Sequence, residues 1–213
     1  MPAKEFNHVD TWVFDLDNTL YPPRMRLFDQ IDLRINDFVM RVTGVDPADA
    51  DVLRKTYWHE HGTTLAGLMQ HYDVDPVPYL IDVHDIDFSV LSPDPGLRAA
   101  IEKLRGRSIV YTNGSAPYAR QVIAARGLEG LFDAVYGVED AQFHPKPQEQ
   151  AFAKVFARDK LDPTRAAMFE DDHRNLKVPH ALGMRTVLVT PEPEQHDHVQ
   201  HHTDDLAGFL NQL

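Results

Sequence analysis

The sequence has no cysteine, and this absence excludes several kinds of chemistry. Disulfide bonds, thiolate metal sites and a cysteine nucleophile are ruled out, and a reducing compartment suits the chain. Long apolar runs are absent as well. No stretch approaches the roughly 18 uninterrupted apolar residues of a membrane helix, and the N-terminal residues have no apolar signal core. We therefore expect a cytoplasmic protein with no membrane partner.

Basic residues are few, since 21 lysines and arginines stand against 33 aspartates and glutamates, with a formal net charge of -12. A protein of this charge repels polyanions, so we expect no nucleic acid polymer as a partner. A small phosphate ester remains compatible, because a bound divalent cation, a lysine or backbone amides can reverse the potential locally. The 213 residues, 43% of them hydrophobic, suffice for one domain with an insertion or for two small domains.

Apolar spacing predicts alternating strands and helices over most of the chain. The run Trp12-Val13-Phe14 ends at Asp15 and predicts a buried strand over about residues 9–15. Further strands are predicted at 107–112, 133–137, 166–170 and 185–190, and helices at 115–127, 148–158 and 174–182. Strands that alternate with helices imply right-handed crossovers and a parallel sheet between two helical layers. The predicted class is therefore α/β, with a Rossmann-like core.

The segment of residues 20–94 has helical spacing and no convincing strand. Helices are predicted from Leu27 to near Gly44 and over about residues 47–60, 63–72 and 76–83. The run Ser92-Pro93-Asp94-Pro95-Gly96 is typical of a linker that leads back to the core. We therefore predict a helical cap domain at 20–94, inserted into a core made of residues 1–19 and 95–213.

The C-terminal segment carries a group of histidines, namely His196, His198, His201 and His202. Such a cluster can bind metal. However, neither the spacing nor an accompanying acid matches a catalytic zinc motif, so we interpret this segment as solvated surface. A short terminal helix is predicted over residues 205–213.

Residues able to carry chemistry lie at four places, which the carboxyl edge of a parallel sheet would bring together. They are Asp15 with Asp17, Thr112 with Asn113, Lys146, and Glu170-Asp171-Asp172. Two carboxylates one residue apart can attack and transfer protons, but they can equally cap a helix. The Thr-Asn pair can hold a phosphate oxygen or form an ordinary turn.

Lys146 and the acidic run at 170–172 are harder to explain as common turn or surface residues than the other two groups. Lys146 lies between Pro145 and Pro147, which restrict its backbone and so limit where its side chain can point. Three adjacent acids repel one another unless a cation compensates, and they therefore indicate a hard metal ion. The alternative for these acids is an exposed acidic turn.

Taken in order, these motifs resemble those of the haloacid dehalogenase superfamily. The four motifs are Asp-Leu-Asp-Asn-Thr-Leu at 15–20, Thr112-Asn113, Pro145-Lys146-Pro147, and Glu170-Asp171-Asp172 followed by Asn175. The resemblance covers about residues 10–190 and places the cap where this superfamily has its first type of helical cap (C1 type). Within the cap, residues 63–68 and 83–87 resemble the pyrimidine 5′-nucleotidase-like members.

The resemblance implies an aspartyl-phosphate mechanism. Asp15 would be the nucleophile, and Asp17 would protonate the leaving oxygen and later activate water. Mg²⁺ would be held by the Asp15 carboxylate, the main-chain carbonyl of Asp17 and the Asp171 carboxylate.

The phosphate oxygens would be bound by the remaining motif residues. These are the Thr112 hydroxyl, the Asn113 amide and Lys146, and they would stabilise the transferring group. Asp172 stands where the family often has serine, and it could coordinate the metal or orient Lys146.

The expected function is therefore hydrolysis of a small phosphorylated metabolite, with a pyrimidine nucleoside 5′-monophosphate as the expected substrate and its base near Thr64 and His84. Another phosphate ester, such as a sugar phosphate or phosphoglycolate, and a phosphomutase reaction remain alternatives. A dehalogenase is disfavoured because the resemblance implies that such enzymes lack the second aspartate and need no metal. A non-catalytic binding protein is disfavoured because every candidate catalytic position is filled. No oligomeric state follows from the sequence.

Overall fold

A computed structural model describes residues 3–213; Met1 and Pro2, with which the predicted core begins, lie outside the described residues. Within residues 3–213, six parallel strands form one sheet in the order β3-β2-β1-β4-β5-β6. The strands are β1 Thr11–Phe14, β2 Arg107–Tyr111, β3 Ala134–Tyr136, β4 Ala166–Glu170, β5 Arg185–Val189 and β6 His201–Thr203. The predicted α/β class with a parallel sheet is confirmed.

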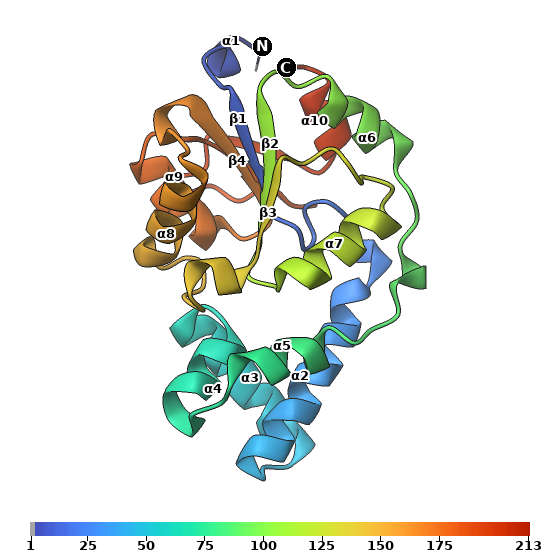
Figure 1. The fold of residues 1–213 in the computed structure, drawn as a ribbon, viewed down its shortest axis with the longest axis vertical. Coiled ribbons are helices and arrows are strands. Elements are labelled where there is room, and N and C mark those ends of the chain that lie inside the picture. The colour runs from blue at the N-terminus through green and yellow to red at the C-terminus, as the bar shows by residue number, and fades with distance from the viewer. Residues whose placement is uncertain (1–2) are drawn as a thin grey trace.

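Helices cover both faces of this sheet (Figure 1). The helices are α1 Ala3–Phe6, α2 Leu27–Thr43, α3 Pro47–His61, α4 Thr64–Tyr72, α5 Pro76–Val83, α6 Pro95–Glu102, α7 Ala116–Ala125, α8 Glu149–Asp159, α9 Lys177–Ala181 and α10 Leu206–Leu210. Short 3-10 helices are η1 Pro23–Met25, η2 Phe88–Val90, η3 Val138–Ala141, η4 Pro163–Arg165 and η5 His173–Leu176. Helices α8 and α9 lie on one face, and α6, α7 and α10 lie on the other.

The central strand β1 shows why both faces are covered. Successive side chains of a strand point to opposite faces. Trp12 and Phe14 accordingly pack in the cluster that includes α6, α7 and α10, whereas Val13 packs in the cluster that includes α8. A strand buried on both faces is apolar without alternation, which is why its sequence is a continuous apolar run.

Helices α2 to α5 lie beyond the carboxyl ends of the strands, below the sheet in Figure 1. Their starts follow from local chemistry, because the side chains of Asp46, Thr63 and Asp75 accept hydrogen bonds from the first backbone N–H groups of α3, α4 and α5. These helices share a third apolar cluster, whose members include Val39, Ala50 and Leu68. The arrangement matches the predicted inserted cap, while the bounds 20–94 stay a prediction.

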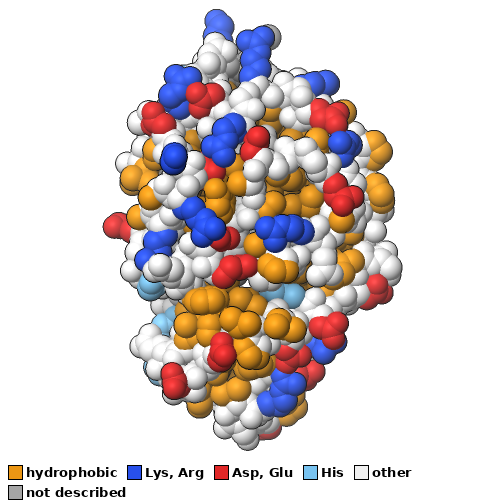
Figure 2. Space-filling model, in the orientation of Figure 1, with side chains coloured by type: hydrophobic (Ala, Val, Ile, Leu, Met, Phe, Trp, Pro, Cys, Tyr) orange, Lys and Arg blue, Asp and Glu red, His pale blue; other side chains and the backbone are white. Residues whose placement is uncertain are grey.

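Several exposed hydrophobic side chains belong to the cap helices. They are Leu33, Val52, Trp58, Tyr72, Val77 and Ile81. On the face seen in Figure 2, hydrophobic side chains gather over the lower part of the molecule, where these helices lie. No helix within residues 3–213 is both long enough and apolar enough to cross a membrane.

Three elements differ from the sequence-based predictions. Strand β6, of sequence His-His-Thr, lies in the segment interpreted as solvated surface, and it pairs in parallel with β5 at the sheet edge. Its polar sequence gives no strand pattern. The strand is held by backbone pairing with β5 and by packing of the His201 ring against Phe6 and Phe209. Helix α6 begins inside the presumed linker, where Asp94 accepts from the N–H of Leu97 and Pro95 is the first helical residue. The predicted helix 174–182 is divided into η5 and α9.

Candidate active site

The predicted site residues lie around one cavity between the strand ends and the cap. Strands β2, β1 and β4 are neighbours in the sheet, so the residues that follow them share one edge. The cavity there has a volume of about 460 Å³. All predicted site residues line it, namely Asp15, Asp17, Thr64, His84, Thr112, Asn113, Lys146 and Asp171.

Lys146 lines the core side of the cavity and is only 1% exposed. Its Nζ donates to Asp15 Oδ1 at 2.7 Å, to Glu170 Oε2 at 2.6 Å and to the Tyr111 carbonyl at 3.1 Å. Asn113 fixes the lysine backbone, because its amide side chain accepts from the Lys146 N–H at 2.8 Å and donates to the Lys146 carbonyl at 3.1 Å. The lysine charge is therefore held in one place.

Asp15, Glu170 and Asp171 form a carboxylate cluster, in which each offers an oxygen within 4.8 Å of the others. Burial, then the charge of Glu170, raises the pKa of Asp15 to about 8. Burial also raises the pKa of Asp171, again with Glu170 next. Burial by itself would lower the pKa of Lys146, but Asp15 and Glu170 raise it, so the lysine stays charged. One cation thus faces three acids.

This donor set fits a hard divalent cation such as Mg²⁺. Carboxylate oxygens are its preferred protein ligands, and a second positive charge would offset the surplus negative charge. The sequence prediction that Asp15 and Asp171 hold the metal agrees with their proximity, and Glu170 joins them. The Asp17 carboxylate lies outside this cluster, and metal binding through its main-chain carbonyl stays a prediction.

Asp17 is held by two tyrosines that the sequence analysis did not identify. Its Oδ1 accepts from the Tyr118 hydroxyl at 2.5 Å and from the Tyr21 hydroxyl at 2.7 Å. Burial raises the pKa of Asp17, and the two hydroxyls oppose that rise because they stabilise its ionised form. Tyr21 lies four residues after Asp17, but Tyr118 lies on α7, and no local pattern connects it to the first motif.

The sequence suggested that Asp172 coordinates the metal or orients Lys146, but its partner in the structure is Arg174. Its carboxylate forms an ion pair with Arg174 at 2.6 Å, and the Arg174 guanidinium lies 3.7 Å from the ring centroid of Trp58 on the cap helix α3. Glu170, and not Asp172, contacts Lys146. Asp172 therefore takes part in a contact between core and cap.

Thr112 is buried beside Asn113, and its Oγ1 accepts from the Gly114 N–H at 2.9 Å. A hydroxyl that accepts one bond keeps its own proton to donate, which suits a phosphate oxygen in the cavity. On the cap side, the Thr64 hydroxyl is engaged with the Arg54 carbonyl at 3.1 Å.

His84 lies at the end of the cap and contacts the core. Its ring stacks on Tyr118 with centroids 4.1 Å apart, and its Nδ1 is 3.2 Å from Ser115 Oγ. Burial lowers the pKa of His84 to about 4, so the ring is neutral at pH 7. His84 therefore links the cap to the tyrosine that holds Asp17.

Known proteins share the fold or part of the sequence. Phosphate metabolism protein 8 of Saccharomyces cerevisiae is 24% identical over 200 residues, which are 86% of this chain and 62% of the yeast protein. The chain thus spans less than two thirds of the length of this curated relative.

Two solved structures have the same fold. YfnB from Bacillus subtilis, a HAD-hydrolase bound to magnesium, has a TM-score of 0.62 at 16% identity and covers 96% of this chain and 98% of its own. CbbY from Rhodobacter sphaeroides, in complex with xylulose-(1,5)bisphosphate, has a TM-score of 0.63 at 18% identity and covers 93% of this chain and 95% of its own.

A family model also matches most of the chain. The model is that of the haloacid dehalogenase-like hydrolases, and it matches residues 9–183, which include every core motif described above. The chain therefore belongs to the haloacid dehalogenase-like hydrolase family.

Proposed function

We propose that this chain is a Mg²⁺-dependent phosphomonoester hydrolase that acts through an aspartyl-phosphate on Asp15. The observation that carries the proposal is the contact of Asp15 with buried Lys146, inside a cluster of three carboxylates at the floor of the cavity. A carboxylate nucleophile for a phosphate ester needs positive charge beside it, both to accept the negative substrate and to remain ionised.

The residues divide the reaction between them. Both oxygens of Asp15 are positioned, since Oδ1 accepts from Lys146 and Oδ2 accepts from the Thr19 hydroxyl at 3.2 Å. One of these oxygens attacks phosphorus while the Thr112 hydroxyl and the backbone N–H of Asn113 bind the phosphoryl oxygens, and Asp17 gives its proton to the leaving oxygen.

The second half of the reaction uses Asp17 in its ionised form. It takes a proton from the water that attacks the phosphoaspartate, and this step regenerates Asp15 and releases phosphate. Mg²⁺, held by Asp15, Asp171 and the main-chain carbonyl of Asp17, with Glu170 beside them, would neutralise phosphoryl charge and favour the ionised form of Asp15.

As the substrate we propose a pyrimidine nucleoside 5′-monophosphate in a cytoplasmic setting. The support is the resemblance of cap segments 63–68 and 83–87 to the pyrimidine 5′-nucleotidase-like members, and the position of Thr64 and His84 on the cavity wall. The volume of about 460 Å³ is in the usual range for small-molecule sites. Apolar side chains of the cap, including Ile31 and Leu80, would contact the base.

A sugar phosphate is the second candidate, because CbbY, which shares the fold, is in complex with xylulose-(1,5)bisphosphate. A phosphomutase reaction would use the same Asp15. The core groups bind only the phosphate, so the cap decides among these substrates.

Hydrolysis of p-nitrophenyl phosphate tests the reaction class. We expect turnover with Mg²⁺, none with EDTA, and none for Asp15→Asn, which lacks the charged nucleophile. Asp37→Asn, a change on the exposed side of α2, is the matched control and should retain activity. Turnover that survives EDTA, or full activity of Asp15→Asn, would show the proposal to be wrong.

A panel of phosphate esters tests the substrate. UMP and CMP should have higher kcat/KM values than sugar phosphates and phosphoglycolate. If the nucleotides are no better, the pyrimidine nucleotide proposal fails while the phosphatase proposal stands.

A further inference from the structure

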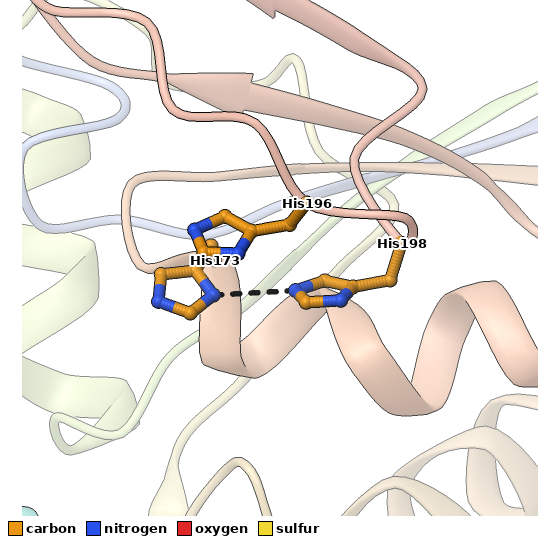
Figure 3. Close-up of side chains that lie close together, drawn as sticks. All are labelled: His173, His196 and His198. Carbon is orange, nitrogen blue, oxygen red and sulfur yellow. Dashed lines mark hydrogen bonds between the residues drawn. The ribbon is translucent and has the colours of Figure 1, made fainter.

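A second group of possible metal ligands lies outside the catalytic cavity. His173 begins η5, directly after the acidic motif, whereas His196 and His198 lie in the segment between β5 and β6 (Figure 3). The sequence suggested only the tail histidines, and neither their spacing nor a neighbouring acid matched a zinc motif. The fold supplies a third histidine, from 23 residues upstream of His196, and places the nearby acid Glu194 beside His196 and His173.

The three imidazoles converge. His173 Nδ1 and His198 Nε2 are 3.2 Å apart, as the dashed line in Figure 3 marks. The His173 and His196 rings stack with centroids 3.7 Å apart, and each of the three histidines offers a nitrogen within 4.8 Å of the others.

Glu194 lies on the other side of two of these rings. Its Oε2 is 3.0 Å from His196 Nε2 and 3.9 Å from His173 Nε2. Only the contact with His196 is within hydrogen-bond distance, and it leaves Nδ1 of His196 available as a ligand. A carboxylate that accepts from the far N–H of a metal-bound imidazole orients the ring and raises its basicity.

We propose that His173, His196 and His198 form a second metal site, which binds Zn²⁺. Zinc–imidazole bonds of about 2.0–2.1 Å in a tetrahedron place two nitrogens about 3.3 Å apart, close to the separation between His173 and His198. His196 would be the third ligand of the ion, and its ring would have to rotate out of the stack with His173. Imidazole nitrogens suit Zn²⁺, whereas Mg²⁺ prefers oxygens, so the two centres differ in the ion they select.

The site would join two segments that are otherwise connected through β5. One is the loop with His196 and His198, and the other is η5, which directly follows Asp171 and Asp172. A bound ion would therefore fix the loop against the element next to the carboxylate cluster. This inference does not depend on the proposed substrate or reaction.

Calorimetric titration of the untagged protein with ZnCl₂ tests the site, because a polyhistidine tag would bind the same ion. Excess Mg²⁺ is present so that the carboxylate cluster is occupied. We expect one Zn²⁺ per chain, with affinity reduced more than tenfold in His198→Gln and in His196→Gln. Glu194→Gln, which removes only the orienting carboxylate, should weaken binding about tenfold.

His59→Gln is the matched control, since His59 is an exposed histidine of α3 outside the cluster, and it should bind Zn²⁺ like the unchanged protein. Thermal unfolding checks that each variant is folded, and Zn²⁺ should raise Tm only where the three histidines are intact. Absence of Zn²⁺ binding under excess Mg²⁺, or unchanged affinity in the folded His198→Gln and His196→Gln variants, would overturn the proposal.

Discussion

At the scale of single residues, the pair of tyrosines on Asp17 has the clearest consequence for the chemistry. A proton donor that later acts as a base needs a pKa near the working pH. Burial raises the pKa of Asp17, while Tyr118 and Tyr21 restrain that rise by donating to the carboxylate. The pKa of Asp17 is thus raised by burial and lowered by the two hydroxyls, and a substitution can remove a hydroxyl without removing the burial.

Tyr118→Phe should raise the pKa of Asp17 further, because the ionised carboxylate loses a donor. A hydrogen bond to a charged group contributes about 1.5–3 kcal/mol, which corresponds to a shift of about one to two pKa units. We expect the limb of the kcat–pH profile that reports Asp17 to move to higher pH by about that amount.

Tyr136→Phe is the control for this variant. Tyr136 also donates to an aspartate, Asp159, at 2.9 Å, but this pair lies outside the cavity. Its removal should leave the pH profile in place. A Tyr118→Phe profile that does not move, or moves to lower pH, would contradict the role given to the hydroxyl.

At the scale of elements, the cap meets the core closely at the end of α3. Gly62 has a φ of +88°, and a Cβ at this position would lie 2.8 Å from the Lys146 carbonyl, with Pro145 and Pro147 also near. Glycine is therefore required here for two reasons, backbone conformation and space. The segment that carries Lys146 forms part of the surface on which the cap rests.

Gly62→Ala should push the cap away from that surface and disturb the cavity. Displacements of about 1 Å can cost about a hundredfold in rate, so we expect kcat/KM to fall at least about tenfold. Gly44→Ala is the matched control: Gly44 also has a positive φ, +75°, but nothing lies within 4 Å of the added Cβ.

Both glycine variants should lose about 1–2 kcal/mol of stability from the left-handed backbone conformation, measured by urea unfolding. Only Gly62→Ala should also have a lower kcat/KM. Equal kcat/KM values for the two variants would show that the contact between Gly62 and the Lys146 segment does not affect activity.

At the scale of the whole molecule, the surplus of buried acid at the cavity links stability to pH and to metal. Without a cation, the pKa of Asp15 in the folded protein is about 8, above the value of about 3.9 in an unfolded chain. The folded state then binds the proton more tightly. The proton bound by Asp15 therefore contributes to stability. This contribution is fully present below about pH 4 and is lost as pH rises toward about 8.

We therefore expect that, in EDTA, Asp15→Asn is more stable than the unchanged protein at pH 8 and that this difference shrinks toward pH 5. The difference at pH 8 should be at least about 1.4 kcal/mol, the free energy of one pKa unit. Urea unfolding of both proteins measures this difference, which includes the effect of the Asp15 charge on the pKa values of Lys146 and Asp171.

Saturating Mg²⁺ should stabilise the unchanged protein more at pH 8 than at pH 5, since the ion binds ionised carboxylates. A smaller gain is expected for Asp15→Asn. An Asp15→Asn protein that is no more stable at pH 8 in EDTA would contradict the excess of negative charge described for the site.

The sequence by itself determined the α/β class and where the chemical groups lie along the chain. These features follow from local patterns, namely an apolar run that stops at a polar residue and helical spacing in the cap. The bounds of α2 to α5 agree closely with the predicted helices for this reason, because each starts or stops at a local capping residue.

Only the tertiary structure decided which side chains meet. The sequence placed Lys146 and Asp15 at one sheet edge, but their direct contact across 131 residues is seen only in the structure. The contact of Tyr118 with Asp17, from 101 residues away, had no signal in the sequence. The pairing of β6 with β5 and the meeting of His173 with His196 and His198 depend in the same way on distant backbone. Local sequence patterns report local conformation, whereas these contacts are set by the order of strands in the sheet, which a single sequence does not encode locally.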